Sequence, residues 1–200
     1  MAGERVAERS RETAETRISL RLDLDGSGQA DLATGIPFLD HMLELFTLHG
    51  LFDLTVRAEG DLAVDYHHLV EDLGLVLGGA LAEALGDKKG ITRYASLSLP
   101  MDETLVRVAV DLGNRPYLRY ALPVLPGFVR DFNTGLFREF FQALVNEGRF
   151  NLHLVRECGE EPHHLAEACF KGVGRALDAA TRPDPRRAEQ VVSTKGTLEA

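Results

Sequence analysis

The feature that most constrains this chain is the pattern His-His-x-x-Glu, which occurs twice, at residues 67–71 and at residues 163–167. Each copy precedes an apolar segment with helical spacing, so each predicts the start of a helix. Because residues four apart lie on one face of a helix, the first His and the Glu of each copy can bind one metal ion together. One copy alone is as typical of a solvated helix end as of a metal site. Two copies at the same helical phase favour a metal-binding role.

The second His of each copy is predicted to address a different ion from the first. It points about 100° away around a helix that has about 3.6 residues per turn. The predicted chelating pairs are His67 with Glu71 and His163 with Glu167, and the histidines left for another ion are His68 and His164. Two ions, each shared between motifs, is the simplest arrangement of these donors.

The segments around the two motifs follow the same order in each half, which indicates an internal duplication. The first half predicts a strand at residues 17–26 that turns at Asp25-Gly26, a return strand at 28–34, a helix at 37–49 ended by Gly50, a strand at 52–58, and a helix from His67 to about Leu85. The second half predicts a strand at residues 104–113, a return strand at 116–122, a helix at 136–146, a strand at 150–156 and a helix at 163–180. Apolar residues alternate in the strands and recur at helical spacing in the helices.

We expect an α/β fold of the α+β type, an internally duplicated unit in which each half is a small, mostly antiparallel sheet with two helices packed on one face. The expected boundaries are residues 1–93 for the first half, 94–184 for the second half and 185–200 for a mobile C-terminal tail. The tail is polar and interrupted by proline, so no further element is predicted there.

The duplication predicts one further metal ligand in each half. His41 lies nine residues before Gly50, and Glu139 lies nine residues before Gly148, so the two side chains occupy equivalent positions. The candidate metal ligands are then His41, His67, His68, Glu71, Glu139, His163, His164 and Glu167. Four ligands for each of two ions leave coordination positions open, and mixed imidazole and carboxylate donors suit manganese or iron better than structural zinc.

Charge and cysteine content narrow the class of protein. A formal net charge of −9 argues against a general nucleic-acid binder. The two cysteines, Cys158 and Cys169, lack CxxC spacing and are expected to be reduced thiols. The N-terminal residues are charged, and the longest apolar stretch, residues 73–85, is too short and too rich in glycine to span a bilayer. We therefore expect a cytoplasmic protein that binds neither membrane nor nucleic acid.

Several segments resemble the imidazoleglycerol-phosphate dehydratases of histidine biosynthesis, and the resemblance covers nearly the whole chain. They are Gly-Ile-Pro-Phe-Leu-Asp-His-Met-Leu at residues 35–43, Asp-Tyr-His-His-Leu-Val-Glu-Asp at 65–72, Pro-Met-Asp-Glu at 100–103, the second His-His-x-x-Glu, and Ser-Thr-Lys-Gly at 193–196. The resemblance implies a homo-oligomer of twenty-four subunits with two Mn²⁺ ions per active site, bound where subunits meet. The chain departs from the family at Glu139, where His is common, at Leu45, where Gln is frequent, and at Val192, where Pro is usual.

The resemblance also implies the reaction, which is the metal-dependent dehydration of D-erythro-imidazoleglycerol phosphate to imidazole-acetol phosphate. The substrate ring would bind the two ions as imidazolate, whose charge expels the neighbouring hydroxyl to give a diazafulvene-like intermediate. The residues implied for catalysis are Glu15, His67 and Glu167, and those implied for substrate and phosphate binding are Arg93, Arg115, Lys171, Ser193 and Lys195. The tail would close over the bound phosphate. Lys88 and Lys89, in contrast, are interpreted as solvated charges.

Two other functions remain open on the residues alone. A dinuclear metallohydrolase of a phosphate ester would use a metal-bound hydroxide and would need no ring-binding site. A non-enzymatic, metal-clipped shell would use the His-rich helices only to join subunits. The cationic Ser-Thr-Lys tail argues against the shell, because joining subunits needs no phosphate site.

Overall fold

The computed structural model describes residues 5–122, 127–188 and 190–198, which form two halves with the same order of main elements. The first half contains β1 (Val6–Glu12), β2 (Thr16–Asp23), β3 (Ala30–Ala33), α1 (Pro37–Gly50), β4 (Asp53–Gly60) and α2 (His67–Leu85). The second half contains β5 (Tyr94–Met101), β6 (Thr104–Asp111), β7 (Tyr117–Ala121), α3 (Leu136–Gly148), β10 (Asn151–Cys158) and α4 (Pro162–Thr181). A hairpin of β8 (Phe128–Val129) and β9 (Phe132–Asn133) precedes α3, and a 3₁₀ helix at Pro185–Arg187 begins the tail.

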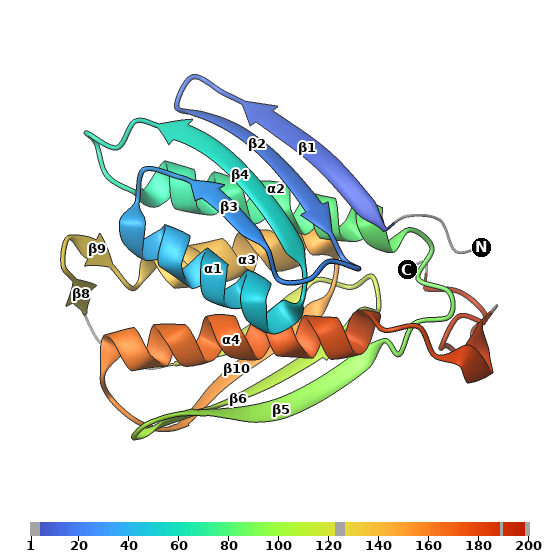
Figure 1. The fold of residues 1–200 in the computed structure, drawn as a ribbon. Helices are drawn as coiled ribbons and strands as arrows, with labels where there is room; N and C mark the ends of the chain where they lie inside the picture. The colour runs from blue at the N-terminus through green and yellow to red at the C-terminus, as the bar shows by residue number, and fades with distance from the viewer. Residues whose placement is uncertain (1–4, 123–126, 189, 199–200) are drawn as a thin grey trace.

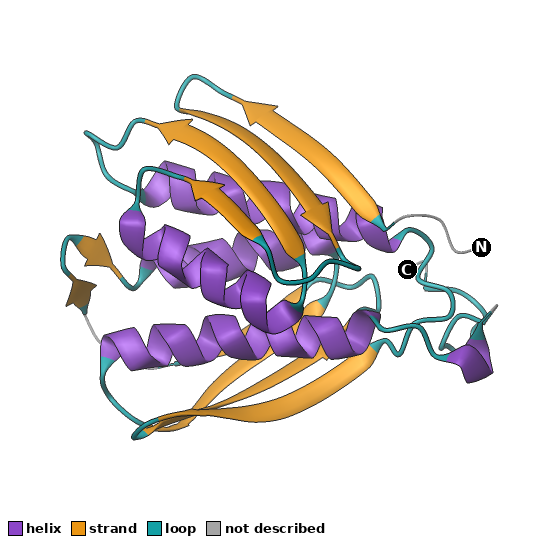
Figure 2. Cartoon of the chain, in the orientation of Figure 1, coloured by secondary structure: helices purple, strands orange, loops and turns teal. Residues whose placement is uncertain are grey.

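Each half builds a four-stranded sheet, and the helices lie between the two sheets (Figure 1 and Figure 2). The strand orders are β1-β2-β4-β3 and β5-β6-β10-β7. In each sheet three strands pair antiparallel, while β3 and β7 pair parallel with their neighbours. The expected fold class is confirmed: the chain is a duplicated α+β unit with two helices on one face of each sheet.

The buried faces follow from alternation in the sequence. In β2 the apolar residues Ile18, Leu20 and Leu22 are buried, and the polar residues between them point to the other face. The same alternation in β6 buries Val106 and Val108. This pattern is typical of an antiparallel sheet that packs one face on a core and leaves the other in solvent.

Helices from different halves pack against each other, α1 on α4 and α2 on α3. Glycine permits both contacts. A Cβ atom at Gly174 of α4 would lie 2.4 Å from the carbonyl oxygen of Phe46 in α1, and one at Gly74 of α2 would lie 2.5 Å from the carbonyl oxygen of Phe140 in α3. A larger residue has no space at either position, because the backbones themselves are in contact. The two halves therefore share one hydrophobic core.

The predicted hairpin at Asp25-Gly26 is wrong. β3 pairs in parallel with β4 and does not fold back on β2, and the return strand predicted at residues 116–122 likewise pairs in parallel with β10. In the first half, Oδ1 of Asp53 at the start of β4 explains the path, since it accepts hydrogen bonds from the backbone N–H groups of Ser27 at 2.7 Å and Gln29 at 2.9 Å. These bonds hold the segment between β2 and β3 across the start of β4. The chain therefore forms β3 on the side of β4 that faces away from β2.

Two edge strands, β1 and β5, have no counterpart among the predicted elements. Of the seven residues in β1 only Ala7 is buried, so an apolar alternation is absent. β5 does alternate, but it contains Pro100, which is tolerated because the strand lies at the edge of its sheet.

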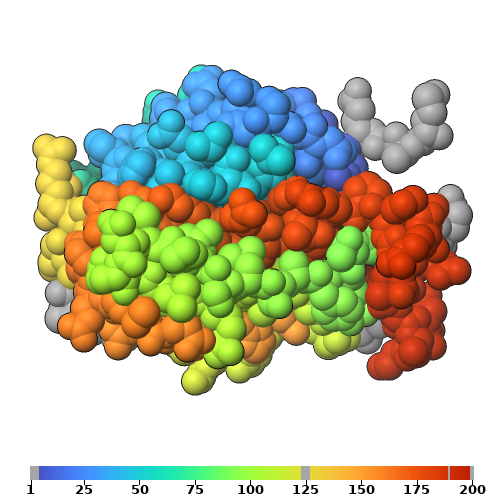
Figure 3. All heavy atoms as spheres, turned by 60° about the horizontal axis from the view of Figure 1, so that its bottom comes forward, coloured from blue at the N-terminus to red at the C-terminus, as the bar shows by residue number. Residues whose placement is uncertain are grey.

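The C-terminal tail runs back along the end of the second half, where Figure 3 shows it in red beside the green segment that includes β5. The backbone N–H of Gly90 donates to the carbonyl of Gln190 at 3.0 Å, and the N–H of Asp184 donates to the carbonyl of Gly90 at 2.7 Å. The mobility expected of this tail stays a prediction.

No helix in the described ranges is long and apolar enough to cross a membrane, and the cytoplasmic location expected from the sequence stays a prediction. Both cysteines are free, with Cys158 exposed and Cys169 buried. Burial raises the pKa of the Cys169 thiol, which keeps this thiol protonated and unreactive.

Candidate metal and phosphate sites

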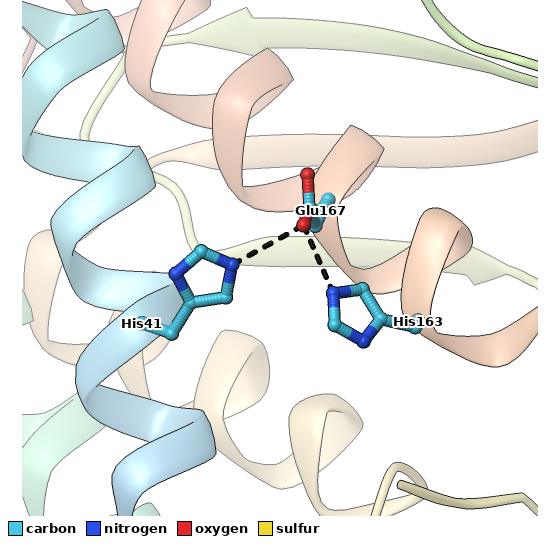
Figure 4. A group of neighbouring side chains, drawn as sticks. All are labelled: His41, His163 and Glu167. Atoms are coloured by element: carbon cyan, nitrogen blue, oxygen red, sulfur yellow. Dashed lines mark hydrogen bonds and ion pairs between the residues drawn. The ribbon is translucent and has the colours of Figure 1, made fainter.

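Three of the predicted metal ligands meet between α1 and α4: His41, His163 and Glu167 (Figure 4). Oε1 of Glu167 lies 3.2 Å from Nε2 of His41 and 2.9 Å from Nε2 of His163. The three donor atoms all lie within 4.8 Å of one another. Among the residues that the structure describes, no other three His, Cys, Asp or Glu side chains place their donor atoms so close together. We call these three residues the metal cluster.

The start of α4 explains why two of these donors share a face. Glu161 precedes the helix, and its Oε2 accepts a hydrogen bond from the backbone N–H of His164 at 2.6 Å. Pro162 occupies the first turn, where its missing N–H costs nothing. The helix therefore begins directly before the motif and brings His163 and Glu167, four residues apart, to the same side.

Glu167 is buried and held in its ionised form. Nζ of Lys171 lies 2.5 Å from Oε2, the carboxylate oxygen that does not face the imidazoles. Burial opposes ionisation of Glu167, but the hydrogen bonds to Lys171, His41 and His163 outweigh it and lower the pKa to about 2. Lys171 thus lies beside the metal cluster, where it orients the carboxylate.

The first motif forms a second pair of donors at the start of α2. Nε2 of His67 lies 3.2 Å from Oε2 of Glu71, which is the four-residue contact expected from helix geometry. Glu139 on α3 does not join them in the described part of the chain and instead lines a hollow with Pro162 and Cys169. Its role as a ligand stays a prediction.

The second histidine of each motif makes a different contact from the first. Nδ1 of His68 lies 3.0 Å from Oδ2 of Asp61, and Nδ1 of His164 lies 2.9 Å from Oε2 of Glu103. The rings of neighbouring histidines are nearly perpendicular, at 85° in the first motif and 83° in the second. Hydrogen bonding to Asp61 raises the pKa of His68, and hydrogen bonding to Glu103 raises the pKa of His164.

A carboxylate on one ring nitrogen of a histidine is the usual support for a metal bound at the other nitrogen. Asp61 and Glu103 therefore leave Nε2 of His68 and His164 for an ion. Reasoning from the sequence missed both carboxylates. Glu103 carried a signal, since it belongs to the Pro-Met-Asp-Glu segment of the resemblance, whereas Asp61 carried none.

Glu15, predicted to act in catalysis, lies in the turn between β1 and β2. Its carbonyl accepts a hydrogen bond from the N–H of Asp61 at 3.1 Å, and its Oε2 lies 3.8 Å from Nδ1 of His68. Its side chain is 55% exposed. The structure therefore places Glu15 beside the second histidine of the first motif.

Four of the five residues predicted to bind substrate and phosphate line one cavity of about 730 Å³ beside the tail. They are Arg93, Arg115, Ser193 and Lys195. Arg187, for which the sequence suggested no role, also lines it. We call this space the cationic cavity.

Arg93 joins the tail to the second sheet. It is 6% exposed, and its Nε and Nη2 donate to the two carboxylate oxygens of Asp111 at 2.7 and 3.2 Å. Its Nη1 donates to the carbonyl of Val192 in the tail. The guanidinium also lies over the ring of Tyr94, 4.5 Å from its centroid. Arg93 is thus an anchor for the tail, while the exposed Arg115 is the more accessible of the two for an anion.

The metal cluster lies near the start of α4, and the cationic cavity lies beside the tail that follows the other end of this helix. Figure 1 shows the tail leaving that end of α4. Glu167 is in the second turn of the helix, and the chain leaves it at Thr181 to form the tail. A helical rise of about 1.5 Å per residue separates these two residues by about 20 Å. One small phosphate ester does not reach both sites of the same subunit.

Comparison with known proteins identifies the family. A sequence model of the family described as imidazoleglycerol-phosphate dehydratase matches residues 34–177. Imidazoleglycerol-phosphate dehydratase of Trichlorobacter lovleyi is 57% identical over 194 residues, which cover 97% of this chain and 99% of that protein. The one from Geobacter metallireducens is 55% identical over 194 residues, with 97% and 99% covered.

Solved structures agree as well. The crystal structure of imidazoleglycerol-phosphate dehydratase from Staphylococcus aureus subsp. aureus N315 matches with a TM-score of 0.81 and 37% identity, over 90% of this chain and 99% of that one. The Pyrococcus furiosus protein in complex with (S)-C348 matches with a TM-score of 0.82 and 36% identity, over 94% and 99%. On the family match, the identities and the shared fold, the chain belongs to the imidazoleglycerol-phosphate dehydratase family.

Proposed function

We propose that this hydro-lyase converts D-erythro-imidazoleglycerol phosphate to imidazole-acetol phosphate in histidine biosynthesis, with two Mn²⁺ ions per active site. The observation that carries the proposal is the convergence of His41, His163 and Glu167 from two helices in a chain of the imidazoleglycerol-phosphate dehydratase family. Two imidazole nitrogens and one carboxylate oxygen suit a borderline divalent ion and leave positions open for a substrate.

The proposed ligands divide between the two motifs. The side chains proposed to hold the two ions are His41, His67, His68, Glu71, Glu139, His163, His164 and Glu167. When bound, the ions supply positive charge that favours the imidazolate form of the substrate ring and orients it. Asp61 and Glu103 support this assignment, since each holds Nδ1 of a second histidine and leaves its Nε2 for an ion.

The acid–base roles follow from the surroundings of the two candidate carboxylates. With a pKa of about 2, Glu167 is a weak base and a suitable metal ligand. Glu15 is more exposed and lies beside His68, so we assign it the removal of the substrate C–H proton. His67, paired with Glu71, keeps a ligand role next to this step.

The cationic cavity is the proposed site of the substrate phosphate. Arg115 offers a planar pair of N–H donors and Lys195 a point charge, and together they can orient and attract a dianion. Ser193 adds a hydroxyl donor. Arg93 binds the tail at Val192 and so keeps Ser193 and Lys195 close to Arg115.

Because the two sites lie at opposite ends of one subunit, we propose that each active site combines the metal cluster of one chain with the cationic cavity of another. The proposed assembly is the homo-oligomer of twenty-four subunits that the resemblance implies. A closed symmetric assembly repeats the same contact around the shell, so every subunit contributes to each kind of site.

Mixing two inactive variants tests the shared site. His163→Ala removes the metal cluster, and Arg115→Ala with Lys195→Ala removes the phosphate contacts. Co-assembled in equal amounts, these variants should regain about a quarter of wild-type turnover, since each half-site is intact in about half of the subunits. Mixing His163→Ala with His41→Ala should restore nothing, because both damage the same cluster. A mixture of opposite-end variants that stays inactive would place the site within one chain.

Two further measurements address the metal and the reaction. Anomalous scattering from crystals soaked with substrate would identify the ions. Turnover of imidazoleglycerol phosphate should exceed that of a simple phosphate ester by orders of magnitude. Equal rates on both compounds would favour a dinuclear metallohydrolase.

A further inference from the structure

Lys88, in the loop between α2 and β5, is buried. It is 3% exposed, whereas the side chain of the adjacent Lys89 is 50% exposed. The interpretation of Lys88 as a solvated charge is therefore wrong. Its backbone φ is 59°, a left-handed conformation that residues with a Cβ atom rarely adopt and that turns this lysine inward. Such a conformation persists only where the surrounding structure enforces it.

The buried ammonium holds the turn that carries Arg115. Nζ of Lys88 donates to Oδ1 of Asn114 at 2.6 Å. Asn114 is also left-handed, with a φ of 61°, and its carbonyl oxygen accepts from Nη2 of Arg149 at 3.4 Å. The next residue, Arg115, lines the cationic cavity. Two cations thus fix the residue that precedes the proposed phosphate ligand.

The charges that face Lys88 are mostly positive. Asp111 at the end of β6 favours its charged form, while Arg149 after α3 and Arg93 in the same loop oppose it. Asp111 is already paired with Arg93. A buried ammonium beside two guanidinium groups and one shared carboxylate is poorly compensated within the chain. An anion in the neighbouring cavity would supply the missing negative charge.

We infer that Lys88 is a positioning residue of the phosphate site, which fixes Arg115 through Asn114 and adds buried positive charge behind the residues that line the cationic cavity. The inference rests on the proposed function for the identity of the anion, a phosphate monoester. Lys88 does not line the cavity itself and acts through its neighbour.

The charge on Lys88 is accessible to titration. Burial is the main cause that lowers its pKa to about 8, and repulsion by Arg149 and Arg93 adds to this, against attraction by Asp111. Lys88 therefore loses its charge as the pH rises through about 8. Anion binding at the cationic cavity should weaken over the same range.

Inhibition of the metal-loaded, assembled enzyme by sulfate tests the inference, because the charge of sulfate does not change between pH 7 and pH 9. In the wild type, the inhibition constant should rise about fivefold over this range, because losing a proton with a pKa near 8 weakens binding by the tenfold expected of Lys88→Met. Lys88→Met should raise the inhibition constant and KM at pH 7 by about tenfold, leave kcat within about twofold, and remove the pH dependence. Asn114→Gly, which suits the left-handed backbone but deletes the amide that Lys88 holds, should raise KM and weaken the pH dependence.

Lys89→Met is the matched control and should behave as wild type at every pH. Arg115→Ala separates this inference from the proposed function. If Arg115→Ala leaves sulfate inhibition unchanged, the cationic cavity is not the anion site. The role of Lys88 is overturned if Arg115→Ala weakens inhibition but Lys88→Met matches wild type. It is also overturned if the inhibition constant of the wild type stays constant between pH 7 and pH 9. The second measurement needs no variant, so it decides the question even if Lys88→Met does not fold.

Discussion

His41 and Glu167 lie 126 positions apart in the sequence, but Nε2 of the one and Oε1 of the other are 3.2 Å apart. This contact exists because α1 and α4 approach closely, with glycine at position 174 against the carbonyl of Phe46. Neither helix alone assembles the three donors. The metal cluster is therefore a product of packing between the two halves of the duplicated chain.

Gly174→Ala should push α1 away from α4 and disturb the cluster. Its Cβ would lie 2.4 Å from the Phe46 carbonyl oxygen, and overpacking of this kind costs about 1–3 kcal/mol. Denaturant unfolding should show the lower stability, and elemental analysis should show less bound metal. Gly172→Ala is the control on the same helix, since its Cβ would meet the side chains of Val108 on β6 at 2.7 Å and Leu99 on β5 at 3.7 Å, and so should lower stability without lowering bound metal. Full metal content in Gly174→Ala would show that the metal cluster does not depend on the close contact between α1 and α4 at this glycine.

Removing a donor of the cluster should remove metal and activity together. We expect His163→Ala, or His67→Ala in the other motif, to lower bound metal by elemental analysis and to abolish dehydration, because each change deletes the partner of a glutamate four residues on. His153→Ala should change neither, since this exposed histidine on β10 contacts only Tyr117 among the ring contacts of the described residues. Normal metal content and turnover in either motif variant would contradict the ligand assignment.

Glu139 offers a test of the equivalence between the halves. Glu139→His should preserve folding and activity, because it introduces the residue common in the family at a half-buried position of α3. Glu139→Ala should weaken one metal site in a competition titration. Wild-type affinity in Glu139→Ala would show that Glu139 only lines the hollow beside Pro162.

Lys195→Ala should raise KM by about tenfold or more and reduce turnover, because it removes a charged contact to the phosphate. Bound metal should stay at the wild-type level, since Lys195 lines the cationic cavity and is not one of the proposed metal ligands. Steady-state kinetics together with elemental analysis separate the two effects. Kinetic constants equal to those of the wild type would show that Lys195 does not contact the substrate phosphate.

Acid should selectively destabilise the metal-free protein through Glu167. Its folded pKa of about 2 lies below the ordinary value of 4.5, so the carboxylate stabilises the fold above pH 4.5 and loses this contribution as the pH falls toward 2. The linkage corresponds to about 3 kcal/mol at most. Glu167→Gln should therefore lower the melting temperature of the chelated protein at pH 6, and the difference from wild type should shrink by pH 3. If the difference in melting temperature is the same at pH 6 and pH 3, Glu167 stabilises the fold by packing and not by its charge.

The sequence by itself determined the features that depend on a few neighbouring residues. The starts of α2 and α4, the contact of His67 with Glu71 and that of His163 with Glu167 follow from the helical repeat and need no knowledge of the rest of the fold. The sequence also predicted the internal duplication and the different directions of the two neighbouring histidines in each motif, because both depend only on the order and spacing of residues along the chain.

Only the tertiary structure decided which helices meet. The spacing before Gly50 and Gly148 made His41 and Glu139 equivalent, but only His41 lies in a cluster with a motif, because that contact depends on how α1 packs on α4 over their whole length. The same holds for the parallel pairing of β3 with β4, the support of His68 by Asp61, and the burial of Lys88 beside the exposed Lys89. Local periodicity is set by backbone geometry over one or two turns, whereas these contacts join segments whose approach is set by the packing of the whole core.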